Sequence, residues 1–344
     1  MHDVGHYPFS HTLEDLPPDP EGRIRIQRHD ARARSIILQD RDVVTALRDA
    51  WGLDPERVAA VIDEEHPPAD ALGRRLAEML AGPLNPDRLD YLQRDSNHVG
   101  VPYGRVIDSE RLLQAIDFTE DGSALAVTPK GVSAVETIIF ASYLMYREVY
   151  WHHTVRAAQA MLKRAAADAM RLGGLTQEEW VDLDDAQALS RLAEAPPPST
   201  RELVGRLAAP GRPIYRRVAD ATLADIEGGK LPRAVGELLA EALEAGYWEQ
   251  QALAEDTARA LRRAGVDLPD HGLLIDVAGR GKELFFEVPV LDRFGGRVVG
   301  TTADPSISLV APNLSRNFDR QAKRAQLLAP PERLEDVRRA LGIG

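Results

Sequence analysis

Histidine and aspartate side chains gather at the start of the chain. Four of the nine histidines, His2, His6, His11 and His29, lie within the first 29 residues. On a helical turn Asp3 and His6 are i,i+3 neighbours and His2 and His6 are i,i+4 neighbours, so these groups can share one side of the turn. Imidazole and carboxylate groups bind transition metals and act as general acids and bases. Because the chain has no cysteine, any metal must be held by histidines and carboxylates.

A second turn can return further polar groups to the same space. Pro8 should end or bend the first turn. The helix that follows can then place His11 and Glu14, again spaced i,i+3, toward that side. A lone histidine is more often structural or on the surface. We interpret this cluster as functional because several such groups coincide.

A polar stripe is predicted on a helix that begins near residue 86. Asn85 suits the N-cap position and Pro86 the first helical position. Asp87, Tyr91 and Asp95 then recur at i, i+4 and i+8, so they share one helical face. This face could line a polar pocket. The alternative is a solvated face with an i,i+4 ion pair.

The elements that must position these groups are mostly helical. A helical period dominates from Ala33 to about Leu172, apart from a short predicted strand at residues 124–128. A Pro-rich stretch at 195–199 marks a candidate boundary before a mostly helical region at about 200–263.

The residue pattern changes from helical to strand-like after Leu268. Residues 272–277, 283–290 and 297–299 are typical of short strands, and residues 279–283 are predicted to form a β-turn, not a phosphate-binding loop. The sequence thus predicts a mainly α protein with a helical core, a short β excursion and a small α+β C-terminal subdomain. The predicted divisions are 1–172, a helical extension at 173–263, and 264–344.

Charge and hydropathy exclude several classes. The chain has 344 residues, 42 Lys and Arg, 54 Asp and Glu, and a formal net charge of −12. This balance argues against broad binding to nucleic acid or anionic lipid. The most apolar stretch, 131–146, is interrupted by Glu136 and is too short to span a membrane. We see no signal peptide and expect a cytoplasmic protein.

Three ordered motifs resemble the HD-domain phosphohydrolases, specifically the deoxynucleoside-triphosphate triphosphohydrolase, or dGTPase-like, branch. They are His2-Asp3-x-Gly5-His6-x-Pro8-Phe9-Ser10-His11, then Asp87-Arg88-Leu89-Asp90-Tyr91-Leu92-x-Arg94-Asp95, then Met145-Tyr146-Arg147-x-Val149-Tyr150-x-His152-His153. The resemblance covers about residues 1–172, which it implies to be an HD catalytic core.

The resemblance implies a metal site and a reaction. His2, Asp3 and Asp87 match the family's metal ligands, and the divalent ion could be Mn, Fe, Zn or Mg. In that family the metal binds the α-phosphate and a water, and the products are triphosphate and a deoxynucleoside.

The resemblance also implies catalytic partners. His29 matches the histidine that protonates the departing 5′ oxygen, and either Asp30 or Glu14 would orient it. His11 and His6 match positions that contact phosphate or lie beside the metal.

Substrate-binding residues follow from the two later motifs. Arg88 would face the β- and γ-phosphates. Tyr91 and Asp95 match residues that contact the sugar and help to exclude ribose. Tyr150 and His153 lie on a helix whose family counterpart contributes to phosphate and sugar recognition.

The sequence departs from the family at its start. The family supplies one further histidine ligand from a helix that precedes the His-Asp doublet, whereas this sequence begins at Met1. We therefore expect an HD core truncated at the N-terminus. The resemblance implies a homo-oligomer. The net negative charge of the chain argues against nucleic acid as a partner. Two other functions stay open: an HD phosphohydrolase acting on another nucleotide phosphoester, and a non-catalytic nucleotide-sensing regulator with a degenerate site.

Overall fold

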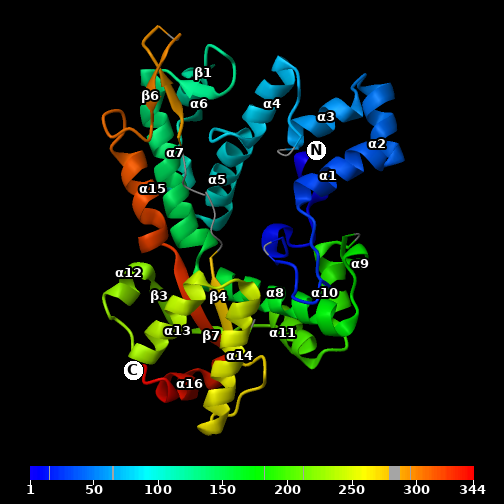
Figure 1. Cartoon of the computed structure of the whole chain (residues 1–344), viewed down its shortest axis with the longest axis vertical. Coiled ribbons are helices and arrows are strands. Elements are labelled where there is room, and N and C mark those ends of the chain that lie inside the picture. Colours follow the sequence, from blue (N-terminus) through cyan, green and yellow to red (C-terminus); the bar gives the residue numbers. More distant parts are fainter. Residues whose placement is uncertain (15, 64–65, 182, 212, 279–286, 295) are drawn as a thin grey trace. The chain divides into compact units, whose positions relative to one another are not determined.

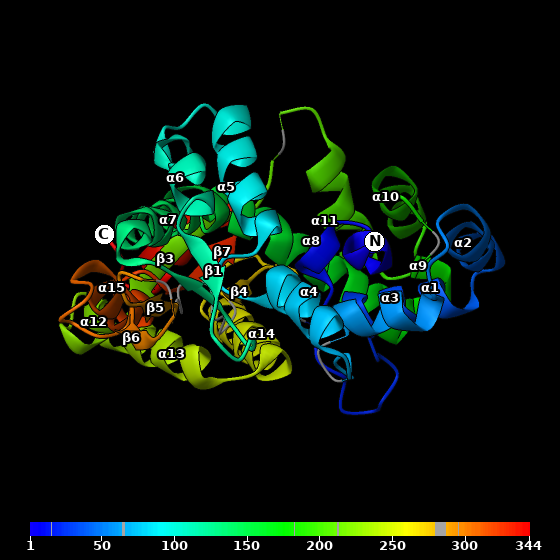
Figure 2. The same ribbon diagram turned by 90° about the horizontal axis from the view of Figure 1, so that it is seen from above.

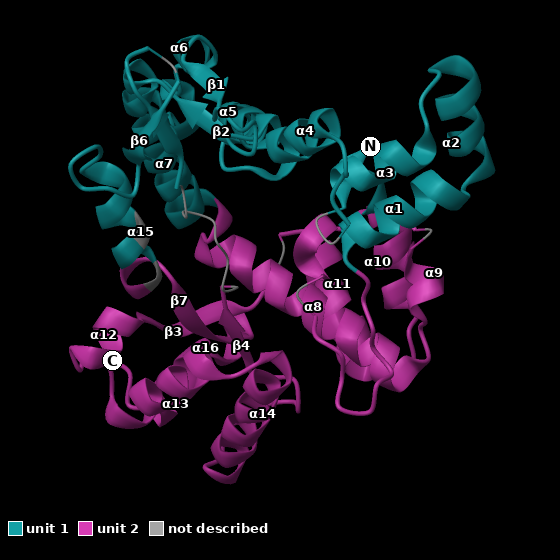
Figure 3. Ribbon diagram, turned by 45° about the horizontal axis from the view of Figure 1, so that its top comes forward, with its two compact units in different colours: residues 1–5, 28–149, 281–318 teal, residues 6–27, 150–280, 319–344 magenta. Residues whose placement is uncertain are grey.

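The computed structural model describes residues 1–14, 16–63, 66–181, 183–211, 213–278, 287–294 and 296–344. The chain is mainly helical, as predicted (Figure 1). It divides into two compact units (Figure 3): unit 1 comprises residues 1–5, 28–149 and 281–318, and unit 2 comprises residues 6–27, 150–280 and 319–344.

The helices of unit 1 follow one another from its N-terminus. Short 3-10 or π turns carry the label η. The elements are η1 (His2–Gly5), α1 (His29–Gln39), α2 (Arg41–Thr45), η3 (Ala46–Ala50), α3 (Pro55–Ile62), α4 (Ala71–Ala81), α5 (Pro86–Val99), η4 (Tyr103–Val106), α6 (Ser109–Leu113), η5 (Pro129–Gly131) and α7 (Val132–Met145). Two further elements, η6 (Tyr146–Tyr150) and α15 (Val310–Gln321), begin in unit 1 and end in unit 2. Helices α1 and α3 lie side by side in Figures 1 and 2.

Local capping explains where the site helices begin. Asn85 Oδ1 accepts the backbone N–H of Arg88 at 2.7 Å, and Pro86 occupies the first turn of α5. The predicted start of this helix is therefore confirmed. Asp54 caps α3 in the same way, and Gly100 ends α5 with a φ of 77°, a left-handed conformation that glycine adopts at low cost.

A four-stranded sheet completes unit 1. Its strands are β1 (Ile116–Phe118), β2 (Leu125–Val127), β5 (Pro289–Leu291) and β6 (Val298–Thr301), in the order β1-β2-β5-β6. The predicted strand at 124–128 is confirmed by β2, and the one at 297–299 by β6. The predicted turn at 279–283 and the first part of the predicted strand at 283–290 fall largely at residues 279–286, outside the described part of the chain.

Unit 2 combines helices with a three-stranded antiparallel sheet. Its elements are η2 (Ser10–Thr12), α8 (His153–Gly173), α9 (Gln177–Val181), α10 (Asp185–Ala193), α11 (Pro198–Ala208), β3 (Arg216–Thr222), α12 (Leu223–Glu227), α13 (Arg233–Glu244), α14 (Tyr247–Arg263), β4 (Leu274–Val277), β7 (Arg324–Ala329), η7 (Pro331–Arg333) and α16 (Leu334–Ala340). The strand order is β3-β7-β4.

Strand β3 interrupts a region that is otherwise mostly helical, as predicted. It lies in the stretch at 200–263 that the helical period assigned mostly to helices. Its register pairs Asp220 with Gln326 and Ala221 with Ala325, more than 100 residues along the chain. Such a strand is decided by its tertiary partner and not by local propensity.

Unit 2 buries charged side chains in pairs. Arg156 donates from Nε and Nη2 to the carboxylate of Asp276 at 2.8 and 2.7 Å. Arg164 donates from Nε to both carboxylate oxygens of Asp168 at 3.0 Å, and Glu255 accepts from its Nη2 at 2.7 Å. These pairs connect α8 to β4 and α14.

The two units have other boundaries than the segments 1–172, 173–263 and 264–344, and that division stays a prediction. Strands of the last segment contribute to both units, β4 and β7 to unit 2 and β5 and β6 to unit 1. None of the helices in the described ranges combines the length and hydropathy needed to cross a membrane.

Candidate metal centre

Three predicted ligands come together in unit 1. His2 and Asp3 lie in η1, and Asp87 lies in the first turn of α5. One ligand atom from each residue lies within 4.8 Å of the others, and Nε2 of His2 is 3.1 Å from Oδ2 of Asp3. A divalent ion about 2.0–2.2 Å from each donor requires donor atoms about 4.4 Å apart at most, so small side-chain rotations would close the site. An imidazole and two carboxylates therefore fit a divalent cation.

Close backbone packing holds η1 in place. A Cβ at Gly5 would lie 1.9 Å from the carbonyl oxygen of His29 and 2.6 Å from the backbone nitrogen of Ala33. Arg32 also donates from Nη1 to the carbonyl oxygen of Gly5 at 2.9 Å. The turn that carries two candidate ligands is thus fixed directly on the first turn of α1. This explains why only glycine fits at position 5.

Helix α5 carries the third candidate ligand and three predicted substrate residues. Asp87 is exposed, whereas Tyr91 and Asp95 are half-buried on the same stripe. Arg88 donates from Nη1 to the carbonyl oxygen of Pro83 at 3.4 Å. Their roles toward a substrate stay predictions.

The ion pair of the alternative interpretation is also present on α5. Nε of Arg94 lies 3.0 Å from Oδ2 of Asp90, and both side chains are exposed. The solvated pair and the polar stripe therefore occupy the same helix. The ion pair is therefore compatible with a polar stripe that faces a ligand.

His29 and Asp30 form the first residues of α1. The carboxylate of Asp30 accepts from Nε of Arg28 at 3.2 Å and from its Nη2 at 3.0 Å. Desolvation raises the pKa of Asp30, but the hydrogen bonds from Arg28 and from the N–H of Ala31 outweigh it and hold the pKa below its ordinary value. Asp30 engages Arg28 closely, and an orienting contact with His29 stays a prediction.

His6, His11 and Glu14 belong to unit 2. Nδ1 of His11 lies 2.9 Å from Oε2 of Glu14, and its Nε2 lies 3.4 Å from Nε2 of His6. Glu14 thus orients His11, the neighbour that the i,i+3 spacing predicted. The three candidate metal ligands, His2, Asp3 and Asp87 (the metal trio), belong to unit 1. A common site that contains both the metal trio and this histidine pair therefore stays a prediction.

Tyr150 ends η6 and His153 begins α8, so the two residues, both in unit 2, do not lie on one continuous helix as predicted. His152 Nδ1 accepts the backbone N–H of Thr154 at 3.3 Å and caps the helix. Desolvation lowers the pKa of His153, and electrostatic interactions with His152, Arg217 and Arg216 lower it further. A substrate contact from either residue stays a prediction.

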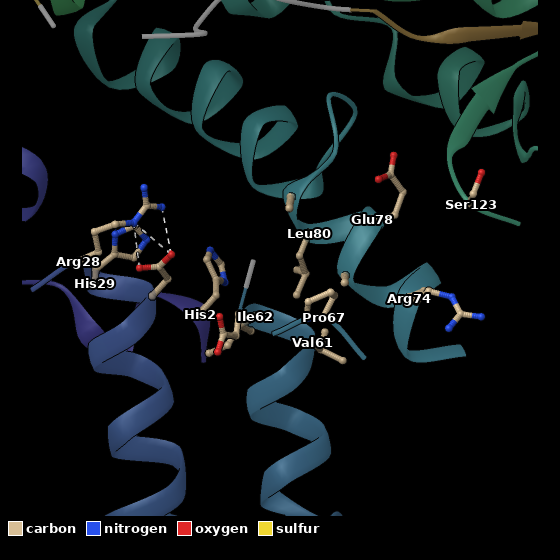
Figure 4. Close-up of a pocket in the computed structure, with 14 residues that line it drawn as sticks. His2, Arg28, His29, Val61, Ile62, Pro67, Arg74, Glu78, Leu80 and Ser123 are labelled. Atoms are coloured by element: carbon tan, nitrogen blue, oxygen red, sulfur yellow. Dashed lines mark hydrogen bonds and ion pairs between the residues drawn. The ribbon is translucent and has the colours of Figure 1, made fainter. Parts of the chain in front are cut away.

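A cavity of about 430 Å³ lies in unit 1 beside the candidate ligands (Figure 4). This volume falls within the usual range of small-molecule sites. It is lined by His2, Arg28, His29, Asp30, Val61, Ile62, Asp63, Pro67, Arg74, Ala77, Glu78, Leu80, Ala81 and Ser123. The metal-ligand candidate His2 and the proposed acid His29 therefore share one cavity.

The sequence pattern did not indicate Arg28 or the side of the cavity formed by α3 and α4. Arg28 belongs to none of the three motifs. The one available signal was its position directly before the doublet His29-Asp30. The α3 and α4 side chains gave no chemical signal because most of those that line the cavity are apolar.

Known proteins resemble this chain in both sequence and fold. Residues 107–245 match the model of the HD associated region. The uncharacterized protein YwfO of Bacillus subtilis is 31% identical over 205 residues, which cover 54% of this chain and 44% of that protein. A protein named deoxynucleoside triphosphate triphosphohydrolase SAMHD1 homolog, from Dictyostelium discoideum, is 22% identical over 262 residues, covering 75% and 47%.

A solved structure shares the fold. A phosphohydrolase from Bacteroides thetaiotaomicron aligns with a TM-score of 0.62 and 21% identity, over 96% of this chain and 77% of that one. The chain spans less than half the length of the two curated relatives above. These comparisons show an HD associated region at residues 107–245 and a fold shared with the Bacteroides structure.

Proposed function

We propose that this chain is a metal-dependent phosphohydrolase that cleaves deoxynucleoside triphosphates to a deoxynucleoside and triphosphate. The observation that carries the proposal is the convergence of His2, Asp3 and Asp87 beside a cavity that also contains His29. The match to the HD associated region and the similarity to the Dictyostelium relative support it. By the same resemblance we propose a homo-oligomer, which light scattering after size-exclusion chromatography tests.

The trio would hold the ion, and the cavity would hold the substrate. A bound Mn, Fe, Zn or Mg ion supplies Lewis-acid polarisation of the phosphoryl oxygen and a bound water of lowered pKa. His29 would donate a proton to the departing 5′ oxygen, which as an alkoxide is a poor leaving group. Proton donation at that atom is therefore the main task left to the protein.

The remaining predicted residues would bind and orient the substrate. Arg88 would contact the outer phosphates, and Tyr91 and Asp95 the sugar. His11, oriented by Glu14 and adjacent to His6, would contact phosphate. Tyr150 and His153 are proposed to add sugar and phosphate contacts.

Product analysis tests the proposal. The purified chain is incubated with each deoxynucleoside triphosphate and Mn²⁺, and the products are separated by anion-exchange chromatography. We expect equal amounts of triphosphate and deoxynucleoside, and loss of both in Asp87→Ala. The matched control Asp90→Ala changes an exposed carboxylate of the same helix and should retain activity.

Two outcomes would contradict the proposal. If the product is orthophosphate or a nucleoside monophosphate, the site hydrolyses a different phosphate bond of the nucleotide. Nucleotide binding without turnover would favour a regulatory protein.

A further inference from the structure

We infer that Arg28, oriented by Asp30, is a phosphate-binding residue of the cavity in unit 1. This inference rests on the proposed function, because it assigns a contact to the phosphate of that substrate.

The position of Arg28 places a cation next to the reacting groups. Arg28 directly precedes α1 in an extended conformation, with φ −62° and ψ 149°. Its side chain lines the cavity together with His2 and His29. Figure 4 shows the side chain of Arg28 beside His29. Its Nη2 donates to the carboxylate of Asp30 at 3.0 Å. A phosphate held near His2 and His29 would therefore come close to this guanidinium.

The lining of the cavity has more carboxylates than arginines. The carboxylates of Asp30, Asp63 and Glu78 line the cavity and would repel a phosphate, whereas its arginines are Arg28 and Arg74. Figure 4 shows Arg74 pointing away from His2. Arg28 is thus the arginine of the lining that can offset phosphate charge beside the trio.

One of these carboxylates is already paired within the protein. Asp63 accepts from Nδ1 of His66 at 3.0 Å and lies 3.4 Å from Nη1 of Arg34. Its charge is therefore partly compensated from outside the lining. The pair of Arg28 and Asp30, by contrast, lies within the lining itself.

The contact between Arg28 and Asp30 orients more than it stabilises. The side chain of Arg28 is 66% exposed, and exposed ion pairs contribute only about 0–1 kcal/mol. Asp30 fixes the planar guanidinium through Nε and Nη2. A guanidinium has five N–H donors in a fork that matches phosphate oxygens, so it has the capacity to serve a carboxylate and a phosphate together.

Binding of inorganic triphosphate, with Mn²⁺ present, tests the inference without requiring turnover. The variants are Arg28→Gln, Arg28→Lys and Asp30→Asn, with Arg41→Gln as an exposed control on α2. We expect Arg28→Gln to raise the Kd of triphosphate about tenfold or more, since hydrogen bonds to charged groups are the strong ones. Arg28→Lys should lie between it and wild type, and the control should match wild type.

Asp30 is a positioning residue in this scheme, and its variants have a distinct signature. Asp30→Asn should weaken triphosphate binding less than Arg28→Gln, and Asp30→Glu should restore part of it. The double variant Arg28→Gln/Asp30→Asn should bind triphosphate with the same Kd as Arg28→Gln alone. Full additivity of the two substitutions would contradict an action of Asp30 through Arg28.

The outcomes separate this inference from the proposed function. Unchanged triphosphate binding and unchanged kcat/KM in a folded Arg28→Gln protein would overturn the inference, even if wild type hydrolyses deoxynucleoside triphosphates. If Arg28→Gln weakens triphosphate binding but wild type shows no turnover, the inference is supported and the proposed function is overturned. If Arg28→Gln does not fold, Arg28→Lys decides by the same criteria.

Discussion

In unit 2 the side chains of Arg156 and Asp276 are 12% and 9% exposed and bind each other through two hydrogen bonds. In unit 1 the side chains of His2 and Asp3 lie 3.1 Å apart and are 38% and 55% exposed. A buried charge must be compensated by a protein partner, and removal of that partner leaves an uncompensated ion. An exposed cluster of donors keeps its hydration and can exchange water for a cation. The contrast separates charges that stabilise this fold from charges that are available to a ligand.

The largest effect on stability is expected in unit 2. Asp276→Ala should lower the free energy of unfolding by about 3–5 kcal/mol, because Arg156 would remain buried without its carboxylate. Urea unfolding followed by circular dichroism measures the change. Asp256→Ala, which removes an exposed carboxylate of α14, should change stability by less than about 0.5 kcal/mol. Equal effects of the two substitutions would remove the distinction between buried and exposed charges.

The opposite pattern is expected for the trio in unit 1. Asp87→Ala should reduce turnover about 100-fold or more, since a metal ion contributes several kcal/mol to the transition state. Its free energy of unfolding should change by less than about 0.5 kcal/mol because the side chain is exposed. Initial rates and urea unfolding on the same preparations measure both quantities. A folded Asp87→Ala protein with wild-type turnover would show that the trio is not the site.

Two glycine substitutions, one in each unit, are expected to change stability in opposite directions. Gly5→Ala should destabilise the protein by about 1–3 kcal/mol, because its Cβ would overlap the carbonyl oxygen of His29. Gly236→Ala, inside α13 of unit 2, meets nothing within 4 Å and should stabilise by about 0.5–1 kcal/mol. Thermal unfolding compares the two variants. A neutral Gly5→Ala would mean that η1 is not fixed by this contact.

The smallest effect concerns pH. The pKa of His153 is lowered by desolvation and by His152, Arg217 and Arg216, while Asp220 opposes the shift. The unfolded chain therefore binds this proton at a higher pH than the folded chain. The stability contributed by neutral His153 is complete above the ordinary histidine pKa of about 6.5 and is lost as pH falls through the lower folded value.

A neutral substitute tests this linkage. His153→Gln should show a smaller loss of unfolding free energy than wild type between about pH 7.5 and pH 5.5. Urea unfolding at both pH values provides the measurement. A steeper loss in His153→Gln would mean that the sign of the shift is wrong.

Local signals in the sequence predicted local structure well. The start of α5 follows from Asn85 and Pro86, whose capping roles depend only on neighbouring residues. The short strand β2 follows from turn residues on both sides. Strand β3 did not follow, because Asp220 pairs with Gln326 across a long stretch of chain. The helical period of its surroundings outweighed a strand whose partner lies so far away.

The candidate site was predictable only in part. The resemblance linked Asp87 to His2 and Asp3, which no spacing rule could do, and the structure brings their ligand atoms together. The packing role of Gly5 depends on the carbonyl oxygen of His29 and becomes visible only in three dimensions. Arg28 was missed because its significance comes from the cavity that it lines.

A titration of Mn²⁺, in which electron paramagnetic resonance detects the free ion, tests whether His2, Asp3 and Asp87 bind a divalent cation. We expect wild type to bind about one Mn²⁺ per chain at the trio, and Asp87→Ala to bind it about tenfold or more weakly. Asp90→Ala, its exposed neighbour on α5, should match wild type. Equal Mn²⁺ affinity in wild type and Asp87→Ala would show that Asp87 is not a ligand of the ion.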